Sequence, residues 1–350
     1  MIKLPLLQRP YVSGKTVFLR ADFNVPLSEN QKIEDATRLT ATLPTIRYLR
    51  DCASRIIIAS HLGRPEKKED KYSLLPIALW LKKELGDEKE KLEIENFGEF
   101  PGWRVADDIF LLENLRFFEG ETSNNTSFAK KLASFSDVYV NDAFGVCHRE
   151  NASIVEITKY LPHFAGLLLE KEVEALSSVL VNPQRPLVVV VGGAKIETKL
   201  PLIDKMHDIA DYVLVGGKLV QETKTLVQLQ HDKNDRIRSA LLIAELNDDG
   251  KDITQESLGH FLHIIDLAKT VVWTGTVGKV EDKDGFRASE EIANAIIKSG
   301  AYSVVGGGDT LGFLSKINLL HKFSFASTGG GAMLAFLSGE KLPGLEALIH

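Results

Sequence analysis

Short runs of aliphatic and β-branched residues, each ending in small or polar residues, are the feature that most restricts the fold of this chain. The first half contains VFLRADF, RIIIASH, IFLLEN and VYVNDAF, and the second half contains PLVVVVGG, YVLVGG, SALLIAEL, TVVWTG, YSVVGGG and FSFASTGGG. Runs that lack polar alternation are typical of strands buried on both faces, as in parallel sheets. Helical patterns such as DATRLTATLPTIRYLRD and SEEIANAIIKSG separate the runs. Strand and helix alternate in two successive series, which predicts two doubly wound, Rossmann-like α/β domains.

A helical segment followed by a proline-containing break, LLLEKEVEALSSVLVNPQRP, lies between the two series. The chain has 350 residues, which is enough for two domains. We therefore expect an N-terminal domain over residues 1–165, a connecting helix or hinge over 166–185, and a C-terminal domain over 186–339.

Composition and charge restrict the class of protein. The net charge of −6 argues against a general nucleic-acid binder. No apolar run is long enough to span a membrane, and the first residues, MIKLPLLQRPYVSG, lack the hydrophobic region of a signal peptide. The two cysteines, Cys52 and Cys147, imply no disulfide framework. We expect a cytoplasmic protein.

Arginine and glycine are distributed unequally between the two halves. Ten of the 14 arginines lie at or before Arg149, whereas 19 of the 27 glycines lie after residue 190. Arginine binds carboxylates and phosphates bidentately, and glycine-rich turns bind polyphosphates through backbone N–H groups. The distribution suggests two halves that bind two different anionic ligands, with chance clustering as the alternative.

The stretch SVVGGGDT (303–310) concentrates the features of a phosphate site. Its glycines allow backbone to approach a ligand, and the following TLGFLSKI reads as a helix whose N-terminus favours an anion. Asp309 would then bind the metal ion that accompanies a phosphate. A tight strand-to-helix turn without a ligand is the simpler alternative, and the Walker A motif is excluded because no Gly-Lys-Ser/Thr follows.

The ordered motifs of the chain resemble those of the phosphoglycerate kinase family. FLRADFNVP, ATRLTATLPTIRYL, SHLGRP, LLENLRF, VNDAFGVCHR and LLLEKEVEAL match in the first half, and VGGAKIETKL, VVGGGDT and STGGGAMLAFLSGEKLPGLEAL match in the second. The resemblance covers nearly the whole chain. It implies a reversible phosphoryl transfer between 1,3-bisphosphoglycerate and Mg-ADP, two domains around a hinge-closing cleft, a monomer, and a C-terminal tail (340–350) that returns to the first domain.

The resemblance assigns the arginine-rich half to the phosphoglycerate, with Arg38 acting on the transferring phosphoryl group. The implied substrate-binding residues are Asp22, Phe23, Asn24, Arg38, His61, Leu62, Gly63, Arg64, Arg116 and Arg149. Turn capping by Asp22 and surface ion pairing by Arg116 and Arg149 are the non-functional alternatives.

The glycine-rich half is assigned to the nucleotide, with Lys195 as the second catalytic residue and Asp309 as the Mg²⁺ ligand. The implied nucleotide-binding residues are Lys195, Lys199, Glu281, Gly306, Gly307, Gly308, Asp309, Thr310, Gly329, Gly330 and Gly331. Lys199 could instead be an exposed helix residue.

The departures of this chain from the family pattern cluster in the nucleotide half. Thr274 and Thr276 replace an asparagine and a proline, Lys218 replaces a glycine, residues 219–249 are fewer than in the family, and GKDITQES (250–257) replaces GLDIGPKT. We expect retained chemistry with altered nucleotide affinity or base preference. A phosphoglycerate-binding relative without efficient turnover, or a purely structural binding protein, remains the alternative.

Histidine and cysteine positions suggest no other chemistry. Cys147 beside His148 would allow a thiol nucleophile, but no other feature supports acyl transfer. His207, His260 and His263 lie in helical patterns, and no spacing indicates a zinc site.

Overall fold

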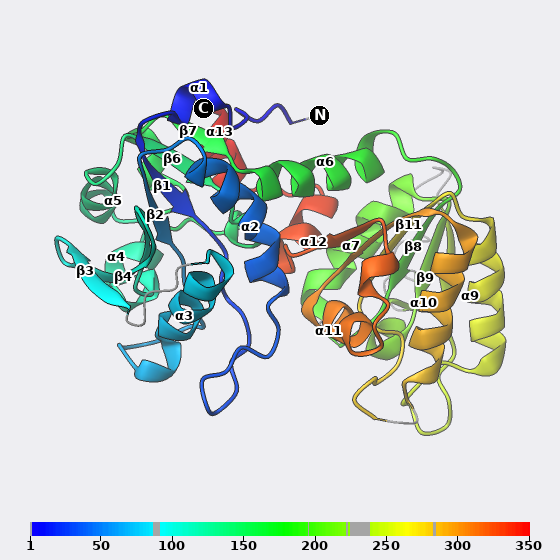
Figure 1. Ribbon diagram of the computed structural model, residues 1–350. Coiled ribbons are helices and arrows are strands. Elements are labelled where there is room, and N and C mark those ends of the chain that lie inside the picture. Colours follow the sequence, from blue (N-terminus) through cyan, green and yellow to red (C-terminus); the bar gives the residue numbers. More distant parts are fainter. Residues whose placement is uncertain (1, 87–91, 195, 222, 225–238, 283–284) are drawn as a thin grey trace. The chain divides into compact units, whose positions relative to one another are not determined.

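The computed structural model describes residues 2–86, 92–194, 196–221, 223–224, 239–282 and 285–350. The chain forms two compact units. The N-terminal unit contains Ile2–Val173 and Lys341–His350, and the C-terminal unit contains Glu174–Glu340. The boundary between Val173 and Glu174 falls inside the helix α6 (Leu167–Val181), so one helix contributes to both units (Figure 1).

The sheet of the N-terminal unit has the strand order β3-β4-β5-β2-β1-β6-β7. Five of its strands are parallel, as expected: β1 (Thr16–Arg20), β2 (Arg55–Ala59), β5 (Ile109–Leu112), β6 (Val138–Asn141) and β7 (His163–Ala165). The hairpin β3 (Glu93–Phe97) and β4 (Phe100–Ala106) pairs antiparallel with β5. The predicted doubly wound parallel sheet is confirmed, and the antiparallel hairpin is added at one edge, where β3 is largely exposed.

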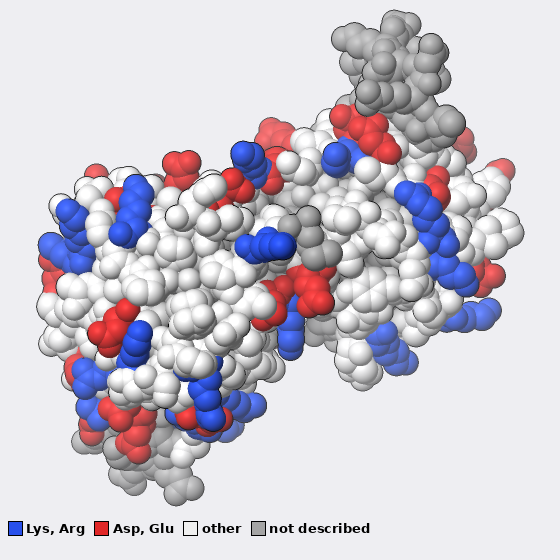
Figure 2. Space-filling view, turned by 90° about the horizontal axis from the view of Figure 1, so that it is seen from above, with Lys and Arg blue, Asp and Glu red and all other residues white. Residues whose placement is uncertain are grey.

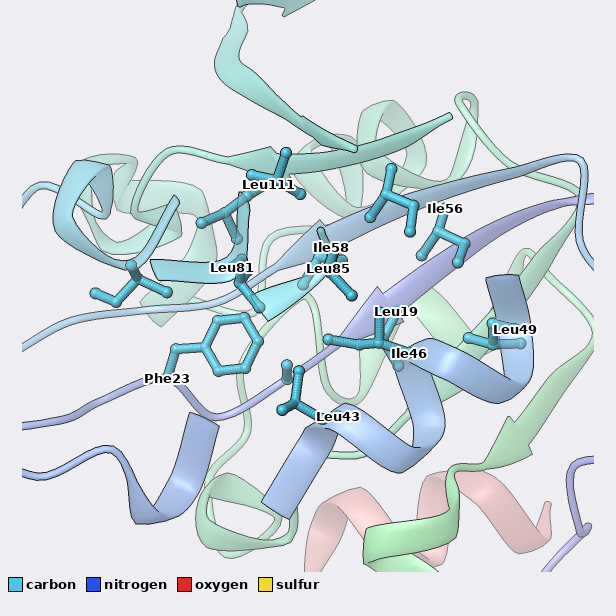
Figure 3. Packing of buried hydrophobic residues seen from close by; sticks show 14 of the residues in the cluster. Leu19, Phe23, Leu43, Ile46, Leu49, Ile56, Ile58, Leu81, Leu85 and Leu111 are labelled. Carbon is cyan, nitrogen blue, oxygen red and sulfur yellow. The ribbon is translucent and has the colours of Figure 1, made fainter. Parts of the chain in front are cut away.

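Apolar side chains of two helices cover one face of this sheet. Leu43, Ile46 and Leu49 of α2 (Thr37–Arg50) and Leu81 of α3 (Leu75–Glu84) pack against Leu19 and other strand residues. Figure 3 shows Phe23, three residues after the end of β1, among these core side chains. Because the residues after β1 are anchored in the core, the polar side chains beside them are held in place. The remaining helices of the unit are α1 (Arg9–Val12), α4 (Glu119–Thr122), α5 (Thr126–Ala133) and α13 (Pro343–Ile349), with 3₁₀ turns at Asp70–Tyr72, Leu115–Phe117, Phe144–Val146 and Glu156–Lys159.

The described strands of the C-terminal unit form a parallel sheet of order β10-β9-β8-β11-β12-β13. The strands are β8 (Leu187–Val191), β9 (Tyr212–Val215), β10 (Ala240–Ile243), β11 (Thr270–Thr274), β12 (Tyr302–Gly306) and β13 (Phe325–Ser327). In chain order this is 3-2-1-4-5-6, the doubly wound arrangement whose strand order reverses between the first and fourth strands. Ligands of such sheets bind at the carboxyl ends beside that reversal, here between β8 and β11.

Helices lie on both faces of this second sheet (Figure 1). On one face, α9 (Gln255–Leu267), α10 (Arg287–Ser299) and α11 (Gly308–Lys316) pack on a core that includes Val190 and Trp273. On the other face α7 (Ile196–Ile209) contacts α12 (Gly331–Leu337). A 3₁₀ turn, Gly217–Leu219, follows β9, and another lies at Leu320–Lys322.

The surface carries charges of both signs. In the view of Figure 2, acidic and basic side chains are interspersed, without a large area of one sign. No helix in the described part of the chain is long and apolar enough to cross a bilayer.

Candidate functional site

Polar side chains gather at the carboxyl edge of the N-terminal sheet. Asp22 follows β1, His61 follows β2, Arg116 follows β5, and Arg149 follows β6. These strands are consecutive neighbours in the order β5-β2-β1-β6, and parallel strands end at the same edge. The topology therefore brings the four predicted positions to one side of the sheet.

Arg38 is held on the loop that follows β1. Its Nη1 donates to the carbonyl oxygen of Asn24 at 2.9 Å and lies 3.2 Å from Asp22 Oδ2. The Asn24 side chain, in turn, accepts from the backbone N–H of Gly63 at 2.8 Å. The loops after β1 and β2 are thus joined, while 28% of the Arg38 side chain stays exposed and available to a ligand.

His61 lies in a strongly cationic environment. Burial lowers its pKa well below the ordinary value, and the positive charges of Arg20, Arg116, Arg38 and Arg149 lower it further. The imidazole is therefore neutral at physiological pH, although Asp22 Oδ1 is 3.9 Å away. The arrangement leaves several guanidinium groups near a neutral histidine, which favours binding of an anion.

Arg116 shows the same excess of positive charge. Burial and the neighbouring Arg149 and Arg20 lower its pKa to about 10. Its Nη1 donates to the Gly63 carbonyl at 2.5 Å, whereas its buried Nε has no hydrogen-bond partner among the described residues. Burial and Arg64 also lower the pKa of Arg149. Arg64 itself is exposed, so it lies at the outer part of this group.

Phe23 and Leu62 differ from the polar residues of this site because their buried side chains are apolar. The Phe23 N–H donates to Ser60 Oγ at 2.8 Å, and the Leu62 carbonyl accepts from Asn114 Nδ2 at 2.8 Å. Both residues place the adjacent polar groups rather than present a side chain to a ligand.

Arg20 is a charged residue of this site that the sequence reasoning missed. It is 1% exposed, and its Nε donates to Ser153 Oγ at 2.7 Å while its Nη2 lies 3.6 Å from Glu121 Oε1. The signal was an arginine within the apolar run VFLRADF, because a buried charge requires a buried partner. Glu121 is fully buried and supplies that partner.

The three glycines of SVVGGGDT lie in three different structural environments. A Cβ on Gly306 would lie 2.1 Å from Met333 Sδ, so a side chain at this position would require the buried Met333 of α12 to move. Gly307 has a φ of 96°, which residues with a side chain rarely adopt. A Cβ on Gly308 would meet nothing within 4 Å. The space beside Gly308, at the first residue of α11, is thus the part of this loop that is open to a ligand.

Polar groups surround this start of α11. Asp309 is exposed in the first turn of the helix. Thr310 Oγ1 is buried and accepts from the backbone N–H of Gly275 at 2.7 Å. Thr274 Oγ1 is fully buried under Gly307 and has no hydrogen-bond partner among the described residues. An orphaned buried hydroxyl is a reason to expect a further polar group at this position.

Lys199 lies inside the glycine loops rather than on the surface of α7. Its side chain is buried, and Nζ donates to the Gly192 carbonyl. The same ammonium group occupies the space where side chains on Gly193 and Gly275 would be. Lys199 therefore joins the loops after β8 and β11 at the strand-order reversal. Lys195, the predicted catalytic lysine, lies outside the described residues.

The remaining predicted nucleotide-binding residues lie on two loops of the C-terminal unit. Gly329 and Gly330 precede α12, and Gly331 is its first residue. Glu281 is exposed in the turn that follows β11 and precedes α10. Among the residues that the structure describes, no hydrogen bond or ion pair joins Glu281 to the glycine loops.

Cys147 is unsuited to nucleophilic catalysis. The thiol is fully buried, and burial raises its pKa to about 12. Its Sγ donates to the Ala143 carbonyl at 3.5 Å, and the thiolate form required of a nucleophile is disfavoured.

A profile of the phosphoglycerate kinase family matches residues 7–231 and 218–340. Phosphoglycerate kinases of Leptospira biflexa and Thermosipho africanus are 38% and 37% identical, covering 99% and 97% of this chain and 99% and 96% of their own lengths. The cytosolic phosphoglycerate kinase of Nicotiana tabacum is 36% identical over 98% of this chain and 97% of its own. The alignment with the Leptospira protein spans 397 positions, so at least 47 of them have no residue in this 350-residue chain.

Solved structures agree with these sequence relatives. Phosphoglycerate kinase from Coxiella burnetii superimposes with a TM-score of 0.81 at 33% identity, covering 98% of this chain and 99% of that one. The Pyrococcus horikoshii OT3 enzyme gives a TM-score of 0.80 at 29% identity, covering 97% and 96%.

Proposed function

The chain belongs to the phosphoglycerate kinase family, and from that premise we propose that it reversibly transfers a phosphoryl group between 1,3-bisphosphoglycerate and Mg-ADP, giving 3-phosphoglycerate and Mg-ATP. The observation that carries the assignment of the substrate site is the group of arginines around a neutral His61. The guanidinium groups of this site outnumber its carboxylates, which suits a ligand with two anionic ends.

We assign the phosphoglycerate to the carboxyl edge of the N-terminal sheet. Arg64, Arg116 and Arg149 would bind its 3-phosphate, and the free Nε of Arg116 supports that role. The Asp22 carboxylate would accept a hydrogen bond from the glycerate hydroxyl, and Asn24 would also contact this hydroxyl. Arg38, held by the Asn24 carbonyl, would bind the carboxyl end and meet the charge of the transferring group.

The nucleotide phosphates are assigned to the start of α11 and to the loops of the strand-order reversal. The N–H groups of the first turn of α11 and the open space beside Gly308 support phosphate binding there. Gly329–Gly331 would contribute similarly at the start of α12, and Lys195 and Lys199 would supply positive charge.

The donor set fits Mg²⁺ held together with a nucleotide. The described residues contain no cluster of three or more potential metal-ligating side chains. Mg²⁺ commonly uses one or two carboxylates and the substrate's own phosphates, and the exposed carboxylate of Asp309 at the phosphate end of α11 meets that requirement. Held there with the nucleotide, Mg²⁺ would supply positive charge to the nucleotide's phosphate groups.

No general base is required in this reaction. The acceptor is a carboxylate, which is already ionised at neutral pH, so phosphoryl transfer depends on positioning and on charge stabilisation. Arg38 in the N-terminal unit and the N–H groups of α11 in the C-terminal unit are the described groups suited to that charge. The reaction requires that the two units bring their ligands together with water excluded.

We also extend the cytosolic location named for the tobacco relative to this chain, and we propose that the protein acts as a monomer. Light scattering of the purified protein tests the second statement.

A coupled assay with 3-phosphoglycerate, Mg²⁺ and ATP, run in parallel with GTP, tests the proposed function. We expect turnover that requires Mg²⁺. Folded protein that binds 3-phosphoglycerate but turns over neither nucleotide would contradict the assignment and indicate a binding protein that has lost catalysis.

A further inference from the structure

The order of the strands determines where the base end of a nucleotide lies in the C-terminal unit. Asp309 and Gly308 follow β12, and the loop of Gly216–Lys218 follows β9. The two loops are separated along the order β9-β8-β11-β12, which is three strand spacings, or about 14 Å. With its phosphates at α11, a nucleotide that crosses the strand-order reversal brings its base to the β8 and β9 loops. This step rests on the proposed function.

The loop after β9 packs tightly against its neighbours until Lys218. A Cβ on Gly216 would contact Val277, and a Cβ on Gly217 would lie 3.0 Å from the Gly193 nitrogen and 3.4 Å from the Thr276 oxygen. These two glycines are therefore required by packing and leave no side chain at the surface. Lys218 is the first residue of this loop with an exposed side chain.

Lys218 has a positive charge that the described protein does not neutralise. No hydrogen bond or ion pair joins its ammonium group to any residue that the structure describes. It follows directly on Gly217, where a Cβ would lie 3.0 Å from the Gly193 nitrogen, so the Lys218 side chain starts beside the loop after β8, where the base is expected. An ammonium group can only donate hydrogen bonds.

The two kinds of purine differ toward such a donor. Guanine and hypoxanthine present acceptors at both O6 and N7, whereas adenine presents an acceptor at N7 beside a donor at N6. We propose that Lys218 donates to O6 and N7 of the bound base and makes this enzyme select 6-oxopurine nucleotides, GTP and ITP, over ATP. ITP is the decisive probe, because it carries O6 and N7 but lacks the 2-amino group of guanine.

The test compares kcat/KM for ATP, GTP and ITP in the wild type, Lys218→Met and Lys218→Arg. One charge-assisted hydrogen bond predicts a preference of about tenfold for GTP and ITP over ATP. Lys218→Met should bring the three values within about twofold of one another by lowering those of GTP and ITP. Lys218→Arg should keep the preference, since arginine also donates to O6 and N7. Lys316→Met is the control: it removes an equal charge at the last residue of α11, and it should leave the kcat/KM ratios of the three nucleotides unchanged.

Two outcomes would overturn the proposal. An equal loss for all three nucleotides in Lys218→Met would place the ammonium group on the phosphates, and unchanged kcat/KM values for all three would remove it from the site. Calorimetric binding of Mg-ADP, Mg-GDP and Mg-IDP to the same variants measures the base preference without turnover. A wild type that binds these diphosphates with the predicted preference, but has no activity, would contradict the proposed function and still support the role of Lys218.

Discussion

The two candidate sites of this protein are built in opposite ways. The site of the N-terminal unit consists of long side chains, of which Arg38 and Arg116 are held by backbone carbonyls. The site of the C-terminal unit consists mainly of glycine-rich loops, and a Cβ on Gly275 or Gly192 would collide with neighbouring backbone. In the first site a substitution removes a ligand contact, whereas in the second most substitutions add atoms where none fit. Loss of function should therefore separate from loss of stability in the N-terminal site and accompany it in the C-terminal site.

Arg38→Ala should have the largest effect on activity. Removal of a preorganised donor to the transition state costs about 10²–10³-fold in kcat. The Arg38 side chain is partly exposed and lies outside the apolar core, so the free energy of unfolding should change by only about 1 kcal/mol. Coupled assays and urea unfolding measure the two quantities on the same protein.

Arg38→Lys is the matched variant for this prediction. Lysine keeps the charge but loses the planar fork, so it should recover only part of kcat. Wild-type kcat in Arg38→Ala would remove Arg38 from the mechanism and leave the side-chain site without its proposed catalytic residue.

Asp142 tests how the N-terminal site is anchored to α6. Its Oδ1 accepts from the N–H groups of Leu168 and Leu169 at 2.9 and 3.1 Å, and burial raises its pKa to about 6. In the unfolded chain the pKa of this carboxyl is about 3.9. The native state therefore binds more protons than the unfolded state between pH 4 and 6. The contribution of Asp142 to stability therefore falls as pH rises through this window, by about 3 kcal/mol in total.

Asp142→Asn removes this titration while it keeps an oxygen for the two N–H groups. The difference in unfolding free energy, variant minus wild type, should increase by up to about 3 kcal/mol from pH 4 to 7. Urea unfolding at several pH values measures it. Asp137→Asn, an exposed carboxylate just before β6, supplies the background, and a difference for Asp142→Asn that does not vary with pH would refute the buried titration.

How much of each site the sequence could predict depends on the kind of interaction that forms the site. The strand exits of the N-terminal unit were predicted because parallel strands end at one edge, so Asp22, His61, Arg116 and Arg149 needed only the strand assignments. The hairpin β3–β4 was missed because its exposed edge strand has no continuous apolar run. The pairing of Arg20 with Glu121 joins residues 101 positions apart, and no local pattern shows it.

The sequence predicted the glycine loops as a group, but it did not show why each individual position is a glycine. The contact between Gly306 and Met333, and the inward position of the Lys199 ammonium group, depend on how separate loops pack. Composition could indicate close backbone approach in this half, but it could not tell approach by a ligand from approach by the protein itself.

Gly306→Ala and Gly308→Ala make that distinction measurable. The Cβ of the first would overlap buried Met333, so overpacking should cost about 1–3 kcal/mol of stability. The Cβ of the second enters open space, and alanine in place of glycine within a helix should leave stability equal or slightly higher. Nucleotide KM should rise mainly in Gly308→Ala. If both variants lose stability equally, packing within the protein requires glycine at both positions, and the open space beside Gly308 is not a ligand position.

Cys147→Ala should have the smallest effect of these substitutions. It tests how far the site of the N-terminal unit extends into the protein interior. Cys147 lies two residues before Arg149, yet its buried thiol has a pKa of about 12 and contacts Asn141 and the Ala143 carbonyl rather than the arginines. We expect unchanged kcat and KM, with about 1 kcal/mol of stability lost through the small cavity. Iodoacetamide should modify the partly exposed Cys52 of the native enzyme before Cys147. A large fall in kcat in correctly folded Cys147→Ala would extend the functional site inward to this thiol and revive a role for it in the reaction.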